Sequence, residues 1–116
     1  MRRIVALIAL GAAIVGCSTV DPSPKLKAAT SAVEAAKAAG AANFPASSDL
    51  LAQAEKYLAS AQSLIKGGDP SAAIQQLSLA SAAADDAKMK ATEATNVAKV
   101  KELDAQIADL KAKLGK

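Results

Sequence analysis

Residues 64–80, LIKGGDPSAAIQQLSLA, decide the fold because they end one helix and begin a much longer one. Gly67 and Gly68 favour the left-handed backbone conformation in which many helices end. Asp69 can cap the free amides of the next helix, and Pro70 suits its first position, where a missing N–H costs no hydrogen bond. The stretch therefore predicts a tight turn between two antiparallel helices.

The segment after this turn contains neither glycine nor proline between Ser71 and Leu114. It can form a single helix of about 45 residues, or roughly 67 Å at 1.5 Å per residue. Small residues recur along its first part at spacings of three and four, which lets a neighbouring helix approach closely. These residues are Ala73, Leu77, Ala80, Ala84, Ala87, Ala91, Ala94 and Ala98.

Two shorter helices are predicted before the turn, over residues 25–41 and 47–66. The first has an apolar stripe at Leu26, Ala29, Val33, Ala36 and Gly40, and the second at Leu51, Ala54, Leu58, Ala61 and Ile65. Asn43 to Pro45 separate the two helices, and Ser47 or Ser48 is expected to cap the second. Both helices are shorter than the third and cover the same end of it, up to about Lys90.

The third helix is therefore expected to extend beyond its neighbours from about Ala94. Larger apolar residues then occupy a shifted face of the helix and form a candidate interface: Val100, Leu103, Ile107, Leu110 and Leu114. A monomer would expose this face to water. The segment is expected either to pair with another helix or to break near residues 92–96 and fold back, and the lack of a helix breaker favours pairing.

Heptad spacing in the tail is typical of a coiled coil. Val100, Ile107 and Leu114 occupy a positions, whereas Leu103 and Leu110 occupy d positions, a pattern that favours parallel dimers. Lys99 at g would then face Asp104 at e of a partner, and Asn96 on the same stripe can fix the register. An unpaired amphipathic tail is the alternative, since fewer than three heptads are present.

The predicted fold is thus all-α, an antiparallel helical hairpin or three-helix bundle whose long third helix ends in a coiled-coil tail. The bundle is assigned to residues 25–98 and the tail to residues 99–116. Residues 18–24, with two prolines and small polar residues, are expected to form a flexible tether.

The first residues have the pattern of a secretory signal sequence. Arg2 and Arg3 precede a short apolar run that is too short to span a bilayer as a helix. The run ends at Ile14-Val15-Gly16-Cys17, which resembles the lipobox of bacterial lipoproteins. That resemblance implies a signal peptide over residues 1–16, cleavage between Gly16 and Cys17, and lipid on Cys17. Several acyl chains would anchor the mature chain firmly to a membrane.

Composition argues against several classes of function. The chain has no histidine and a single cysteine, so it lacks the usual zinc or copper ligands and any Ser-His-Asp or Cys-His catalytic system. Without Arg2 and Arg3, the 14 Lys+Arg become 12 against 11 Asp+Glu, a net charge of +1. This near-neutral balance is not that of a nucleic-acid-binding protein. We expect no enzyme activity, no metal and no cofactor other than the covalent lipid.

Three resemblances bear on function. The stretch from Lys25 to Ala98 resembles a family of alanine-rich bacterial envelope lipoproteins of unknown function. In that family the helical domain is often followed by an OmpA-like domain, whereas a coiled-coil tail is expected in its place here. The hairpin also resembles half of a tetratricopeptide-type helix pair, which implies a groove for a client protein near Tyr57 and Leu64. Cys17, the tail heptads and Lys116 are similar to features of the murein (Braun) lipoprotein, which implies covalent attachment of Lys116 to peptidoglycan.

Together, the residues and resemblances favour a non-enzymatic lipoprotein that acts as a helical scaffold, spacer or adaptor. Ser18 after the cysteine is similar to outer-membrane sorting signals in enteric-type lipoproteins, which implies an outer-membrane anchor facing the periplasm. Self-association or binding of an envelope protein is expected. The alternatives are a tetratricopeptide-like binding module and a lipoprotein that links the outer membrane to peptidoglycan.

Overall fold

The computed structural model describes residues 20–115, so the predicted signal peptide, Cys17 and Lys116 lie outside the described residues. Three α-helices and one short 3-10 turn make up the described chain, and no strand occurs within residues 20–115. The elements are α2 (Ser23–Ala38), η1 (Ala41–Asn43), α3 (Pro45–Lys66) and α4 (Pro70–Leu114). The prediction of an all-helical chain is confirmed.

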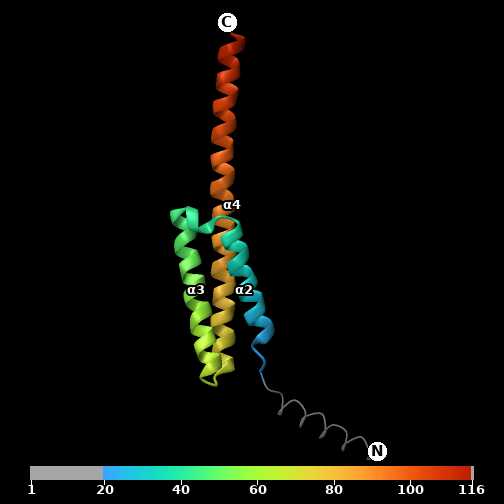
Figure 1. Ribbon diagram of the computed structural model, residues 1–116, viewed down its shortest axis with the longest axis vertical. Helices are drawn as coiled ribbons and strands as arrows, with labels where there is room; N and C mark the ends of the chain where they lie inside the picture. Colours follow the sequence, from blue (N-terminus) through green and yellow to red (C-terminus); the bar gives the residue numbers. More distant parts are fainter. Residues whose placement is uncertain (1–19, 116) are drawn as a thin grey trace, which may run out of the picture.

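Helix α4 is the longest element, and both other helices pack against its first part (Figure 1). Its most extensive contacts are with α3; α2 also packs along it, and α2 and α3 contact each other less. With 45 residues, α4 runs without interruption over the predicted range. Most of the structure is therefore organised around one continuous helix.

The turn between α3 and α4 forms where the sequence predicts it, although only one of the two glycines is left-handed, since Gly67 keeps a helical φ of −78°. Gly68 has a φ of 86°, in the left-handed region that favours glycine, and Pro70 is the first residue of α4. The carboxylate of Asp69 accepts a hydrogen bond from the backbone N–H of Ala72 at 3.1 Å. This bond satisfies one of the four amides that lack a partner at the start of any helix.

Replacing Asp69 with alanine should lower the free energy of unfolding by about 1 kcal/mol, because the Ala72 amide loses its acceptor. Thermal unfolding followed by circular dichroism would measure the loss. The Asp69→Asn variant keeps a capping oxygen and is expected to lie close to the parent chain. Equal losses in both variants would show that the capping oxygen, which asparagine keeps, contributes nothing to the free energy of unfolding.

The connection between α2 and α3 differs from the prediction. Helix α2 ends at Ala38, three residues early, because Gly40 adopts a φ of 86° and stops it instead of extending its apolar stripe. Helix α3 begins at Pro45, so Ser47 lies inside its first turn and is no cap. The buried hydroxyl of Ser47 lies 2.6 Å from the carbonyl oxygen of Ala41, to which it donates. This bond ties η1 to α3.

Helix α2 begins at Ser23, two residues before the predicted start. Pro24 falls in the first helical turn, where proline removes no helical hydrogen bond, so it does not belong to a tether. The Asp21 carboxylate accepts a hydrogen bond from the Ser23 backbone N–H at 2.9 Å. That bond holds the pKa of the Asp21 carboxyl below its usual value.

The core is narrow and consists mainly of alanine. Its buried hydrophobic residues are Ala29, Val33, Ala36, Ala41, Leu51, Ala54, Ala61, Ala73, Leu77, Ala80, Ala83, Ala84, Ala87 and Ala91. Leu58 and Ile65, predicted on the α3 stripe, are partly buried against this core. Alanine removes little apolar area from water, so the few larger side chains carry much of the hydrophobic stabilisation.

Candidate interaction surface

Helix α4 extends well beyond α2 and α3, as the helix lengths predict (Figure 1). The last buried residue of α4 is Ala91, and every residue from Asn96 to Gly115 is exposed. Ala98, which was expected on the buried stripe, is among the exposed residues, because α2 and α3 end before they reach it. The terminal part of α4 therefore buries no side chain within the described residues.

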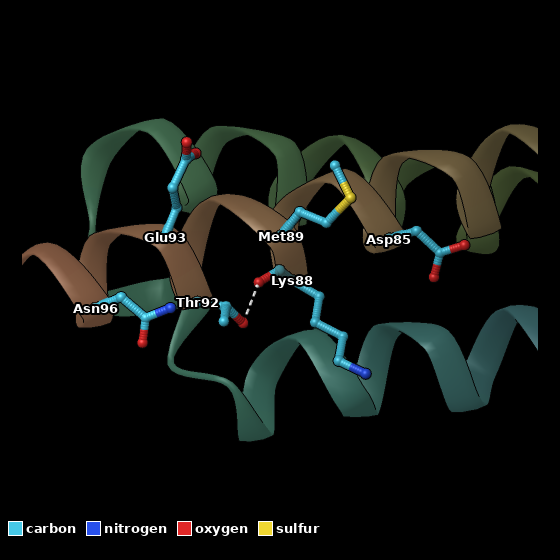
Figure 2. Close-up of a pocket in the computed structure, with 6 residues that line it drawn as sticks. All are labelled: Asp85, Lys88, Met89, Thr92, Glu93 and Asn96. Atoms are coloured by element: carbon cyan, nitrogen blue, oxygen red, sulfur yellow. Dashed lines mark hydrogen bonds between the residues drawn. The ribbon is translucent and has the colours of Figure 1, made fainter.

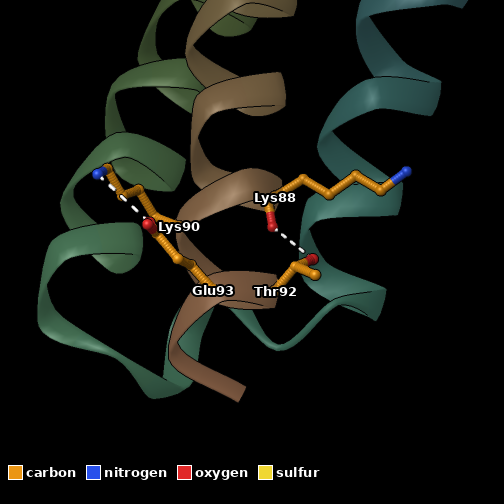
Figure 3. A network of polar contacts seen from close by, with 4 residues as sticks. All are labelled: Lys88, Lys90, Thr92 and Glu93. Atoms are coloured by element: carbon orange, nitrogen blue, oxygen red, sulfur yellow. Dashed lines mark hydrogen bonds and ion pairs between the residues drawn. The ribbon is translucent and has the colours of Figure 1, made fainter. Parts of the chain in front are cut away.

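The helix does not break at residues 92–96, so the fold-back alternative is wrong for this structure. The Thr92 hydroxyl donates to the carbonyl oxygen of Lys88, and the Thr95 hydroxyl to that of Ala91, each at 2.9 Å. Figure 3 shows the first of these bonds within the turn of α4. Both hydroxyls thus bond within the helix, and α4 continues through these residues to Leu114.

Five large apolar side chains line one side of this exposed part of α4, and we call them the tail stripe. They are Val100, Leu103, Ile107, Leu110 and Leu114, the residues predicted from the heptad pattern, and they are between 49% and 86% exposed. Full burial of each such side chain contributes about 1.5–3 kcal/mol relative to exposure. The tail stripe therefore has the chemistry of a helix interface that lacks its partner helix.

Val97 belongs to the exposed apolar surface although it lies outside the predicted heptad interface. It is 51% exposed and lines a shallow groove with Phe44 and Lys101, where α4 leaves the packed helices. In the heptad repeat Val97 occupies an e position, beside the a and d positions that form the predicted interface. Its hydrophobicity at a flanking position was the available signal.

The tail stripe and the buried stripe lie on different sides of α4. At about 100° per residue, the mean direction of the tail stripe is about 150° from that of the buried residues between Ala73 and Ala91. The tail stripe is therefore not a continuation of the face that packs against α2 and α3. It lies on the same side of α4 as the face that those two helices leave uncovered, and farther toward the C-terminal end of the helix.

A shallow groove marks this uncovered face within the packed part of α4, and Figure 2 shows its six side chains. It is lined by Asp85, Lys88, Met89, Thr92, Glu93 and Asn96, all of them exposed. We call these residues the free face. Helical phase places Met89 and Asn96 in line with the tail stripe.

The polar side chains of the free face offer little preorganised chemistry. Lys90, beside it, forms an ion pair with Glu93 at 3.5 Å, and both side chains are more than half exposed (Figure 3). Exposed pairs of this kind contribute at most about 1 kcal/mol. Within residues 20–115, no three His, Cys, Asp or Glu side chains are placed to share a metal ion.

The predicted client groove near Tyr57 and Leu64 is occupied by these side chains themselves. Both residues are partly buried, Tyr57 against both core clusters and Leu64 against one. Side chains that pack against the core in this way present less apolar surface to a client. This packing does not favour the tetratricopeptide-like interpretation.

Comparisons with known proteins add no assignment. No protein-family model matches the chain, and neither the curated proteins nor the solved structures yielded a match. None of the helices in residues 20–115 combines the length and hydrophobicity needed to cross a membrane. The resemblances drawn from the sequence therefore stay predictions.

Proposed function

We propose that this chain is a non-enzymatic lipoprotein of the bacterial envelope. Lipid on Cys17 would anchor it in the outer membrane, and its helices would act in the periplasm as a scaffold, spacer or adaptor. The signal sequence and Ile14–Cys17 support the proposed location, and helix α4 supports the proposed function. We also propose that α2, α3 and the first part of α4 act as one three-helix bundle, with the tail as a coiled-coil segment.

The positions of the two ends of the fold support a spacer. Helix α2 begins at the same end of the molecule as the α3–α4 turn, whereas α4 ends at the opposite end (Figure 1). Ser23 follows Cys17 by six residues, which span at most about 20 Å when fully extended. A lipid on Cys17 would thus hold the packed helices close to the bilayer and direct the tail away from it.

The observation that carries the proposal is the tail stripe at the far end of α4. Large aliphatic side chains in a 3-4 pattern along an isolated helix indicate a surface for another helix. At about 1.5 Å per residue, the end of α4 lies roughly 67 Å from the α3–α4 turn. The proposed function is to present this surface at that distance, either to a second copy or to an envelope protein.

Lipid attachment is tested by labelling cells with radioactive palmitate. The parent chain should incorporate label and fractionate with the outer membrane. The Cys17→Ala variant should remain unlabelled and keep its signal peptide, since both acylation and cleavage depend on the cysteine in this class of signal. An unlabelled parent chain, with an unchanged location of the variant, would contradict the anchor.

Presentation of the tail stripe is tested by cross-linking in intact cells followed by mass spectrometry. The full chain should form cross-linked products through its tail, and Leu110→Asp should reduce them strongly because a buried charge is costly. Ala105→Asp places the same charge on the opposite side of the same helix and should keep the products. Equal yields for both variants would contradict an interface at the tail stripe.

Covalent attachment to peptidoglycan through Lys116 stays a prediction, because Lys116 lies outside the described residues. Digestion of purified cell wall with lysozyme would test it. Attachment would release the chain with a muropeptide on Lys116, whereas an unattached chain would be recovered free after boiling in detergent.

A further inference from the structure

We infer that the tail stripe pairs in parallel with the tail stripe of a second copy anchored in the same membrane. The inference deepens the proposed function, and its argument from the anchor rests on that function. Three other observations bear on it independently. They are the direction of the stripe around α4, the charges that flank it, and the acidic residues at the heptad positions between the stripe and the packed helices.

The direction of the tail stripe leaves room for a second copy. Because the stripe points about 150° away from the buried face of α4, α2 and α3 lie on the other side of the helix. Two α4 helices can therefore lie side by side, with α2 and α3 of each copy on the outside. Neither α2 nor α3 therefore obstructs a partner helix at the tail stripe.

Flanking charges favour the parallel orientation. In a parallel pair, Lys99 at a g position faces Asp104 at an e position of the partner, and this contact occurs twice. An antiparallel pair that aligns Val100 with Leu110 places Asp104 beside its own copy. It also places Lys99 beside Lys113, so the like charges oppose that orientation.

The extent of the pairing is set by acidic residues. The a positions below Val100 are Glu93 and Asp86, both exposed, and in a parallel pair each would meet its own copy. The two helices should therefore separate below Asn96. Pairing is confined to about 19 residues, or roughly 28 Å of helix.

A paired segment of this length is short, since confident coiled coils extend over three or four heptads. Anchoring in one membrane shifts the equilibrium between single and paired tails toward pairing. Two chains on one membrane, with tails directed the same way, meet at a far higher effective concentration than free chains. The membrane also imposes the parallel orientation that the charges favour.

Cysteine cross-linking of the full chain in isolated membranes tests this arrangement. A cysteine replaces Leu103, Leu110 or Ala105, copper phenanthroline with dissolved oxygen serves as the oxidant, and dimers are measured on non-reducing gels. Leu103 and Leu110 are d positions that meet their own copies only in a parallel pair, whereas Ala105 faces away. The parent chain, whose single cysteine is Cys17, gives the background.

We expect at least ten-fold more disulfide-linked dimer for Leu103→Cys and Leu110→Cys than for Ala105→Cys. Dimers in equal amounts for all three variants would overturn the inference, because they would show no defined face. A mixture of Val100→Cys and Leu110→Cys chains should give little disulfide between the two variants, and a predominant product of that kind would show antiparallel pairing and overturn it too.

The failure of this inference can be separated from failure of the proposed function. Palmitate on Cys17, together with cross-links from the tail to a different protein and none between copies, would overturn the pairing and leave the anchored spacer intact. Loss of the palmitate label would contradict the proposed anchor, whichever dimers form.

Discussion

Replacement of Leu77 by alanine is expected to lower the free energy of unfolding by about 2–5 kcal/mol. Leu77 is fully buried on α4 and is the largest such side chain in residues 20–115. The other buried residues of its cluster are all alanines, whose short side chains cannot extend into the cavity. For a domain of this size, such a loss lowers the melting temperature by roughly 10–30 °C.

Leu79→Ala is the matched control for this prediction, because it makes the same substitution two residues away. Leu79 is 46% exposed and should cost well under half as much as Leu77. Thermal unfolding followed by circular dichroism would compare the two. Similar melting temperatures would contradict the packed arrangement, since they would mean that burial of Leu77 contributes no more than a surface contact.

Replacement of Ala84 by leucine should also destabilise the fold, by about 1–3 kcal/mol or more. Ala84 is fully buried in the cluster that also contains Ala36 and Ala54, so all three packed helices contribute to its surroundings. Three added heavy atoms would have to push α2 or α3 away from α4. Urea unfolding at equilibrium would measure the effect as a lower midpoint.

Ala105→Leu controls for helix propensity in the second prediction. Ala105 lies on the same helix, is exposed, and is surrounded by solvent. Leucine is nearly as good a helix former as alanine, so this variant should unfold close to the parent chain. If Ala84→Leu were as stable as Ala105→Leu, the helices would have to pack more loosely than the structure shows.

Much of the fold could be predicted from the sequence because its signals are local. Gly68, Asp69 and Pro70 specify their turn through backbone preferences and one short hydrogen bond. The range of α4 follows from the absence of glycine and proline, and the exposed tail follows from the different helix lengths. These features depend on neighbours in sequence and on simple distances.

The α2–α3 connection was predicted less well because its determinants act through tertiary contacts. Gly40 fits an apolar stripe as well as a helix end, and only the return of the chain into η1 requires its left-handed backbone. Serine often caps a helix, yet the hydroxyl of Ser47 is buried and donates a hydrogen bond to the Ala41 carbonyl. Sequence spacing does not separate these roles.

The candidate surface likewise has features that follow from local sequence and features that depend on tertiary contacts. The residues of the tail stripe were predicted individually, because the heptad pattern depends on spacing alone. Their direction relative to α2 and α3 required the structure, since it depends on which alanines of α4 are buried and where the two other helices end. Val97 was missed because it flanks the heptad seam.

Sedimentation equilibrium of residues 18–116 is the most direct test of the central claim, that the exposed part of α4 is a pairing surface. At high micromolar concentration, the parent chain should show a dimer whose fraction rises with concentration. Leu103→Asp, with unchanged helicity, should remain monomeric. A parent chain that is fully helical and strictly monomeric over this range would contradict the claim.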